Sequence, residues 1–196
     1  QQLFTTARGM GIDNQEQLVI LSDGARWINK LAQTQYPKAT LILDWWHLKR
    51  RVWPTVRGLP ADELSDQERP GWGQQWIDQL WRGQSSQTLQ SIMILAPQLG
   101  GQPSEKPAQL EERSLLALHQ FISNNRAAII DYHHFQQSGY YIGSALVEKT
   151  VDLLVCRRQK LRGQNWSRTG ADRLLCWRQL ILNDQWDDYW QPPEAA

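Results

Sequence analysis

The chain has 196 residues, of which 41% are hydrophobic and 21% are charged, and its formal net charge is +1. This length suits one sizeable domain, or a domain with a helical insertion, and the composition is ordinary for a folded cytosolic protein. No apolar run approaches the roughly 18 residues that span a bilayer, and no basic-then-apolar leader opens the sequence, so we expect a cytoplasmic protein without a membrane partner.

The first part of the chain predicts a strand, a helix and a second strand. Leu18–Ser22 is a short apolar run rich in Val and Ile, and an Asp-Gly pair ends it, which indicates a buried strand. Ala25–Gln35 has apolar residues at helical spacing, and Thr40–Leu43 is a second buried run. The short links predict a parallel crossover unit of an α/β fold. Function gathers at the carboxyl ends of such strands, where Asp23 and Asp44 fall.

Helices alone are expected from residue 48 to about residue 135. Trp72, Trp76 and Trp81 recur at helical intervals and should contribute to the core of this region. A Gly/Pro/Ser-containing link then breaks the pattern, and two further helices follow it. The expected bounds are Pro97–Pro107 for the link, and 108–124 and 125–135 for the two helices. This region therefore has the pattern of a helical insertion.

The last part of the chain begins with a glycine-punctuated loop, residues 136–144. A helix is expected from Ala145 to about Leu161, and another over Arg168–Asn183, before a tail. The segment is basic, because Lys149–Leu182 holds eight Lys or Arg residues against two acids, a local charge of +6. Such a cluster suggests a polyanionic partner, although a solvated helix face has the same composition.

The two cysteines carry no metal or redox signature. Cys156 and Cys176 lie in helical-looking polar contexts without C-x-x-C spacing. We therefore expect both to be buried, reduced thiols.

Four residues are candidates for chemistry: Asp23 after one strand, Asp44 and His47 after the next, and Glu148 near a helix start. Carboxylates that gather from separate elements at a sheet edge suit Mg²⁺, which prefers oxygen ligands. Structural alternatives exist for each. Asp23 fits an Asx-turn, Asp44 and His47 fit a satisfied buried pair, and Glu148 is favourable with the helix dipole. Asp152, one turn further along, is expected to pair with the local Arg cluster.

Three stretches resemble a known family: "SDGARWI", "ILDWWHL" and "GYYIGSALVEKTVDLLVCRRQKLRGQNWSRTGADRLLCWRQLILNDQWDDYW". Together they are similar to the Mutator-like group of DDE transposases of bacterial insertion sequences. The resemblance covers Leu18 to about Trp190, with several separate motifs in the family's order. It implies an α/β fold in which the last two strands and flanking helices of a ribonuclease H-like core carry a large all-helical insertion.

The resemblance also assigns residues. Asp23 is implied to be the second acid of the DDE triad and Glu148 the third, and both bind Mg²⁺ or Mn²⁺. Asp44 and His47 match the D-x-x-H signature, which either orients the catalytic site or contacts DNA. A basic run with one tryptophan is implied to contact DNA. Its members are Arg157, Arg158, Lys160, Arg162, Trp166 and Arg168.

The first acid of the triad has no counterpart in this sequence. Asp13 is the only aspartate upstream of Asp23, and it is too close and lies in a polar loop. Because the chain also starts with Gln1 rather than Met, we expect the first three strands and the first acid to lie upstream. This piece alone is then expected to be inactive.

The resemblance implies a DDE transposase that cuts double-stranded DNA at insertion-sequence ends and transfers the strand to target DNA. It would work as a homo-oligomer on DNA in the bacterial cytoplasm, associated with the nucleoid. Two alternatives are an inactive DNA-binding transposase remnant and a structural, multimer-forming domain. The expected organisation is a partial core at 1–47, the insertion at 48–135, C-terminal core helices at 136–190, and a tail at 191–196.

Overall fold

The computed structural model describes residues 2–12, 17–59, 64–65, 68–98 and 114–191. The chain divides into two compact units, Gln1–Ser144 and Ala145–Ala196, and each is described by itself. The elements of the first unit are α1 (Gln2–Gly9), β1 (Val19–Ser22), α2 (Arg26–Gln35), β2 (Thr40–Leu43), α3 (Trp45–Arg57), α4 (Glu68–Trp81), α5 (Ser85–Gln98), α6 (Leu115–Asn124), the 3₁₀ turn η3 (Arg126–Ala128) and α7 (Tyr132–Gln137).

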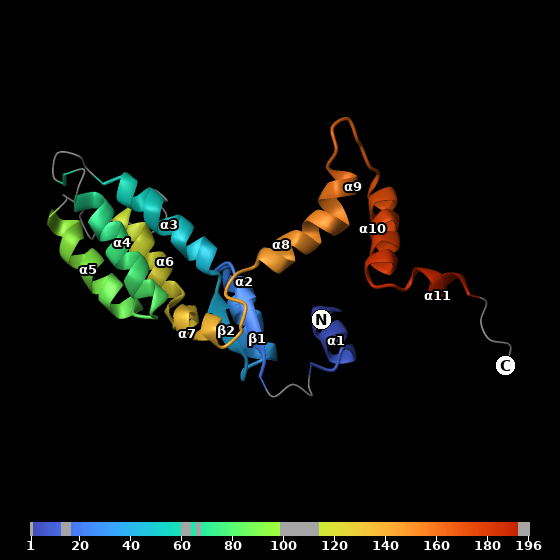
Figure 1. Cartoon of the computed structure of the whole chain (residues 1–196), viewed down its shortest axis with the longest axis horizontal. Helices are drawn as coiled ribbons and strands as arrows, with labels where there is room; N and C mark the ends of the chain where they lie inside the picture. The colour runs from blue at the N-terminus through green and yellow to red at the C-terminus, as the bar shows by residue number, and fades with distance from the viewer. Residues whose placement is uncertain (1, 13–16, 60–63, 66–67, 99–113, 192–196) are drawn as a thin grey trace. The chain divides into compact units, whose positions relative to one another are not determined.

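The two strands of the first unit form a parallel pair joined through α2 (Figure 1). The register pairs Val19 with Thr40 and Ser22 with Leu43, so the carboxyl ends of both strands lie at the same edge. Ile42 and Leu43 are fully buried, which explains the continuous apolar run of β2. The structure therefore confirms a helix-rich α/β chain with a small parallel sheet.

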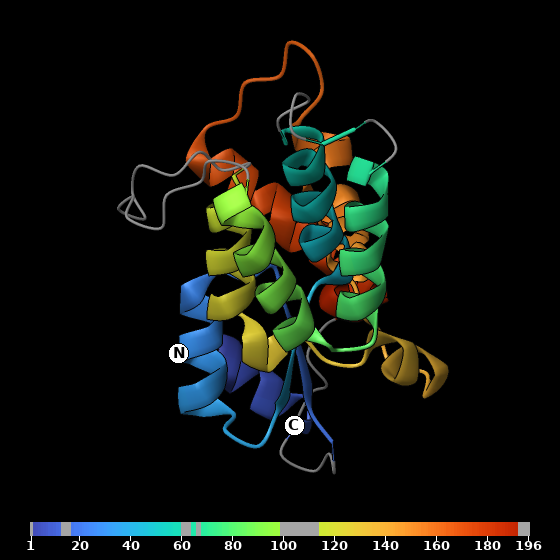
Figure 2. The same ribbon diagram turned by 90° about the vertical axis from the view of Figure 1, so that its left-hand side faces the viewer.

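The predicted insertion is a bundle of four helices. Helices α3, α4, α5 and α6 pack each against the next, and α6 packs back on α3 (Figures 1 and 2). The bundle begins at Trp45, three residues before the expected boundary. Trp76 is fully buried, and Trp72 and Trp81 pack partly buried against the core, so the expectation for these tryptophans is confirmed.

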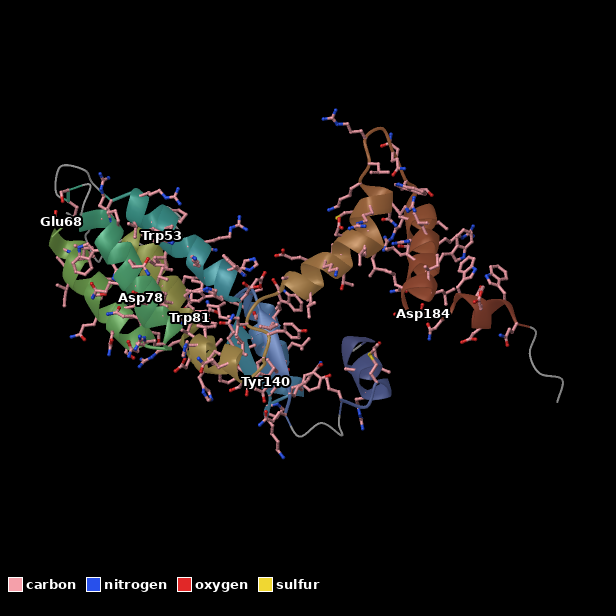
Figure 3. All side chains as sticks on the ribbon, in the orientation of Figure 1. Trp53, Glu68, Asp78, Trp81, Tyr140 and Asp184 are labelled. Atoms are coloured by element: carbon pink, nitrogen blue, oxygen red, sulfur yellow. The ribbon has the colours of Figure 1, made fainter. Side chains whose placement is uncertain are left out.

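A glycine sets the close approach of α3 and α4. A Cβ atom at Gly73 would lie 2.7 Å from a ring carbon of Trp53, a distance that real Cβ atoms essentially never show. Trp53, labelled with Trp81 in Figure 3, therefore packs on bare backbone at this point of the bundle.

One expectation about this region is wrong, and several others fall on residues that the structure does not describe. The helix expected over 125–135 is wrong, because Asn125 ends α6, Ile129 is extended, and Asp131 starts α7 as its N-cap. A bridge between Arg82 and Asp131 holds the extended segment. Asp13, residues 99–107 of the link, the first part of the helix expected from 108, and the tail at 192–196 lie outside the described residues.

The second unit is entirely helical in its described part. Its elements are α8 (Ala145–Val151), the π-helical η4 (Asp152–Cys156), α9 (Arg157–Gln159), α10 (Arg168–Leu182) and α11 (Trp186–Trp190). Arg178 Nη2 donates to the carbonyl of Leu153 at 2.7 Å, and Gln159 Nε2 donates to that of Ala171 at 2.9 Å. These bonds join α10 to the preceding helical segment that runs from α8 through η4 to α9. The two helical segments together form a helical hairpin.

Parts of the second unit differ from expectation. The helix expected from Ala145 to about Leu161 has a π-helical turn inside it and ends at Gln159, and the chain beyond the last expected helix, which was to end at Asn183, contains the short helix α11. Asp184 (Figure 3) turns the chain into α11 with a φ of 54°, a conformation that aspartate tolerates better than most residues. Both cysteines are free, as expected, but Cys176 is exposed and Cys156 only half-buried, so the expected burial is wrong.

Across the described residues, every helix is too short or too polar to span a bilayer.

Candidate functional site

The carboxyl ends of β1 and β2 meet at one edge of the sheet. The backbone N–H of Asp44 donates to the carbonyl of Ser22 at 2.7 Å, which is the last hydrogen bond between the two segments. Asp23 and Asp44 follow directly. Because strand pairing fixes this register, the structure brings together these two predicted site residues.

Asp23 stands in a tight turn with its carboxylate at the surface. Its Oδ1 accepts the backbone N–H of Ala25 at 2.9 Å, which is the Asx-turn geometry considered from the sequence. Gly24 in the same turn has a φ of 92°, and a Cβ there would lie 3.0 Å from Phe121 of α6. The turn is therefore packed against the bundle, and it holds the exposed carboxylate of Asp23 in a fixed place.

Asp44 accepts more hydrogen bonds than any other described acid of the first unit. Its side chain is 1% exposed. Oδ1 accepts the backbone N–H groups of Trp46 at 2.7 Å and His47 at 3.0 Å, so Asp44 is the N-cap of α3. Oδ2 accepts the backbone N–H of Ser144 at 2.6 Å. One buried carboxylate thus binds two segments that are 100 residues apart in the chain.

These contacts set the charge of Asp44. Burial raises the pKa of its carboxyl, but the hydrogen bonds from Ser144 and His47, and the nearby imidazole of His47, hold the pKa below its usual value. Asp44 therefore remains a carboxylate near neutral pH. Its hydrogen-bond donors are the backbone N–H groups of Trp46, His47 and Ser144 and the Ser144 side chain, which favours an orienting role over metal ligation.

His47 lies within ion-pair distance of Asp44, but no hydrogen bond joins the two side chains. Its Nδ1 is 3.4 Å from Asp44 Oδ1, and this buried nitrogen has no hydrogen-bond partner among the described residues. The sequence alternative, an imidazole N–H donated to the carboxylate, is therefore not formed. The His47 side chain is 39% exposed, so part of the ring faces solvent at the same sheet edge.

The segment that leads to Glu148 is attached to this edge by backbone hydrogen bonds. The N–H of Trp45 donates to the carbonyl of Ile142 at 3.0 Å, in addition to the bond from Ser144 to Asp44. Buried Tyr132 donates its hydroxyl to the carbonyl of Leu43 at 2.8 Å. We call Asp23, Asp44, His47 and Ser144 the strand-end group.

Glu148 lies in the second unit, as an exposed residue of α8, four residues after Ser144. Its proximity to Asp23 stays a prediction. Among the described residues, no group of three or more His, Cys, Asp and Glu side chains is gathered as a metal site. The carboxylates of Asp23 and Glu148 have the hard oxygen donors that Mg²⁺ prefers, so their chemistry fits the ion.

The basic run of the second unit is largely at the surface. Arg157 Nε donates to Asp152 Oδ2 at 2.8 Å, which confirms that Asp152 pairs with the Arg cluster. Trp166 is 44% exposed. The remaining members of the run are exposed cations, namely Arg158, Lys160, Arg162 and Arg168.

A separate groove of about 450 Å³ lies at the other end of the strands, where Val19 and Thr40 begin them. Lys38, His134 and Tyr140 also line it, and the Tyr140 hydroxyl donates to the side-chain carbonyl of Gln17. None of the residues expected to carry chemistry lies in this groove.

Comparisons with protein-family models, with curated proteins and with solved structures found no match to this chain.

Proposed function

We propose that this chain is the C-terminal portion of a DDE transposase, which cuts DNA at insertion-sequence ends and transfers the strand in a metal-dependent reaction. In this proposal β1, α2 and β2 belong to a ribonuclease H-like core, and the four-helix bundle is its insertion. Asp23 and Glu148 supply two acids of the triad.

The observation that carries the proposal is the hydrogen bond from Ser144 to Asp44 at the end of β2. It fastens the start of the Glu148 segment to the sheet edge from which Asp23 projects. Four helical residues advance only about 6 Å along a helix axis. Chain connectivity therefore limits how far Glu148 can lie from the end of β2, and the proposal requires that Glu148 and Asp23 share one ion.

In the strand-end group, Asp23 would bind the metal ion and Asp44 would orient the neighbouring segments. Asp23 uses Oδ1 in its own turn, which leaves Oδ2 for a cation and fixes the direction in which it points. Asp44 is occupied by three backbone donors and orients Trp46, His47 and Ser144. When bound, Mg²⁺ supplies activation of the attacking hydroxyl and stabilisation of the leaving oxygen.

Asp23→Asn distinguishes the structural role of Asp23 in its turn from its proposed role as a metal ligand. Asparagine retains the side-chain oxygen that accepts the Ala25 N–H, so we expect the stability to change by less than about 0.5 kcal/mol. The carboxylate is lost, so Mg²⁺-dependent cutting of transposon-end DNA should fall about 100-fold or more. The measurement is single-turnover cleavage by the protein that carries this chain together with the first acid, beside urea unfolding of both variants.

Cleavage by Asp23→Asn at the parental rate would remove Asp23 from the site and overturn the proposal. Binding of transposon-end DNA without any cutting by the parental protein would instead favour the inactive remnant.

The exposed cations of the basic run are expected to contact phosphates. Replacing Arg158, Lys160 and Arg162 together by alanine should weaken duplex binding and reduce the slope of log affinity against log salt by about three. The measurement is anisotropy of a labelled duplex between about 50 and 200 mM salt. Lys30, Lys38 and Arg57, three exposed cations of the first unit, give a charge-matched control triple that should retain the parental slope. Equal losses of duplex affinity in both triple variants would show that binding depends on net charge alone and not on the basic run.

A further inference from the structure

Two adjacent tryptophans after β2 have opposite environments. Trp45 is 7% exposed and packs against the rings of Trp81 and Tyr132, with centroids 4.8 and 5.0 Å away. Trp46 is 58% exposed. Neighbouring residues of a helix point about 100° apart, so Trp45 enters the core while Trp46 faces solvent beside the strand-end group.

Trp46 is held in place although it is exposed. Its backbone N–H donates to Asp44 Oδ1 at 2.7 Å. The edge of its ring lies over Gly143, where a Cβ atom would come within 3.2 Å of Trp46 Cδ1. A Cβ atom at this distance would crowd the ring, so the backbone at Gly143 lies close beneath Trp46 and supports it. An aromatic surface fixed in this way loses little conformational entropy when a ligand stacks on it.

Positive charge accompanies the ring. The Lys49 ammonium lies 5.3 Å from the ring centroid of Trp46, within cation–π distance, and Arg50 next to it is exposed. Trp27 is even more exposed, at 66%, but no cation–π contact to it is found among the described residues. Trp46 thus combines a flat apolar surface with cations that suit a phosphate backbone.

We propose that Trp46 stacks on an unpaired base at the end of a DNA strand, while Lys49 and Arg50 contact the adjoining phosphates. The inference rests on the proposed function and names the part of the DNA that this sheet edge holds. Base–aromatic stacking tolerates any base, because every base presents a π-face, and the flexible Lys49 stem lets its ammonium move to a phosphate. The role given to Trp46 is binding and positioning, with no part in bond making.

The experiment compares DNA ends on the 196-residue chain without any cleavage step. The probes are a labelled duplex with a short 3′ single-stranded overhang, the same duplex with abasic sites in the overhang, and a blunt duplex. Trp46→Ala should weaken binding of the overhang duplex by about 5- to 150-fold and leave blunt-duplex binding nearly unchanged. Trp46→Phe should retain most of the preference for the overhang, because it keeps an aromatic face.

Two controls make the result specific. Trp27→Ala removes another exposed tryptophan and should keep the parental preference for the overhang. The abasic overhang should weaken binding of the parental chain, but it should add little to the loss in Trp46→Ala, because both changes remove the same stacking contact. Circular dichroism of each variant checks that the helices are retained.

The possible failures are distinguishable. If the parental chain and Trp46→Ala show the same ratio of overhang to blunt affinity, the stacking inference is wrong, whereas salt-dependent duplex binding would leave the transposase proposal standing. If the chain binds none of the three DNA probes, both proposals fail.

Discussion

Replacing Asp44 by alanine should lower the free energy of unfolding of the first unit by about 2–4 kcal/mol. The variant removes the N-cap of α3, a contribution of about 1 kcal/mol, and it leaves the N–H of Ser144 without its acceptor in a partly buried place. The measurement is urea unfolding of the chain, followed by the helical circular dichroism signal.

Asp131 provides the matched control. It is also an N-cap aspartate, and its carboxylate accepts a single backbone N–H, that of His134, at 2.9 Å at the surface. Asp131→Ala should cost about 1 kcal/mol. If Asp44→Ala costs no more than Asp131→Ala, Asp44 does not connect the two segments in the way that its three hydrogen bonds indicate.

Acid titration tests the same carboxylate in a second way. The pKa of Asp44 is lowered in the folded state, so its stabilising contribution is complete above the unfolded-state pKa of about 3.9 and is lost as pH falls through the folded pKa. Asp44→Asn does not titrate at this position. The stability difference between the parental chain and Asp44→Asn should therefore be constant near neutral pH and shrink at acid pH.

The strand–helix–strand unit followed from local sequence because each element has its own signal. The apolar runs before Asp23 and Asp44 are short and rich in branched residues, and the structure has β2 at Thr40–Leu43 as expected. The positions of Asp23 and Asp44 then follow from strand pairing alone. No resemblance to a known family was needed for that part of the site.

The role of Asp44 did not follow from sequence, because its partner is remote. Ser144 contributes a backbone N–H, which every residue except proline possesses, so no side-chain pattern marks it. Trp45 and Trp46 are also indistinguishable by residue type. Their different environments depend on where Gly143 and Tyr132 pack against the start of α3.

The segment 125–135 carries local signals against the continuous helix expected there. Asn125 and Asp131 are residues that commonly flank helices, and two isoleucines between them are β-branched. Helical continuity was the wrong inference, because the segment from Ile129 instead bridges to Arg82. With the helix interrupted here, the hydroxyl of Tyr132 donates to the carbonyl of Leu43 at the end of β2. The expectation of a continuous helix did not include this contact.

Glu148→Gln should reduce Mg²⁺-dependent cutting about 100-fold or more while DNA binding stays near the parental affinity. Glutamine keeps the size of the side chain and its exposed position on α8, so loss of the negative charge is the main change. The measurements are single-turnover cleavage of transposon-end DNA, with the first acid present, and anisotropy of the same DNA in Ca²⁺, which separates binding from chemistry.

Asp152→Asn is the control within the same unit, because it removes an equal charge one helical turn further along. The Asp152 carboxylate already pairs with Arg157 at 2.8 Å in an exposed place, so this variant should cost less than about 1 kcal/mol of stability and leave the cleavage rate within a few-fold of the parent. Loss of cutting in Asp152→Asn with retained cutting in Glu148→Gln would move the third acid to Asp152. Retained cutting in both variants would leave α8 and η4 without a catalytic carboxylate, and the assignment of the third acid to this segment would be wrong.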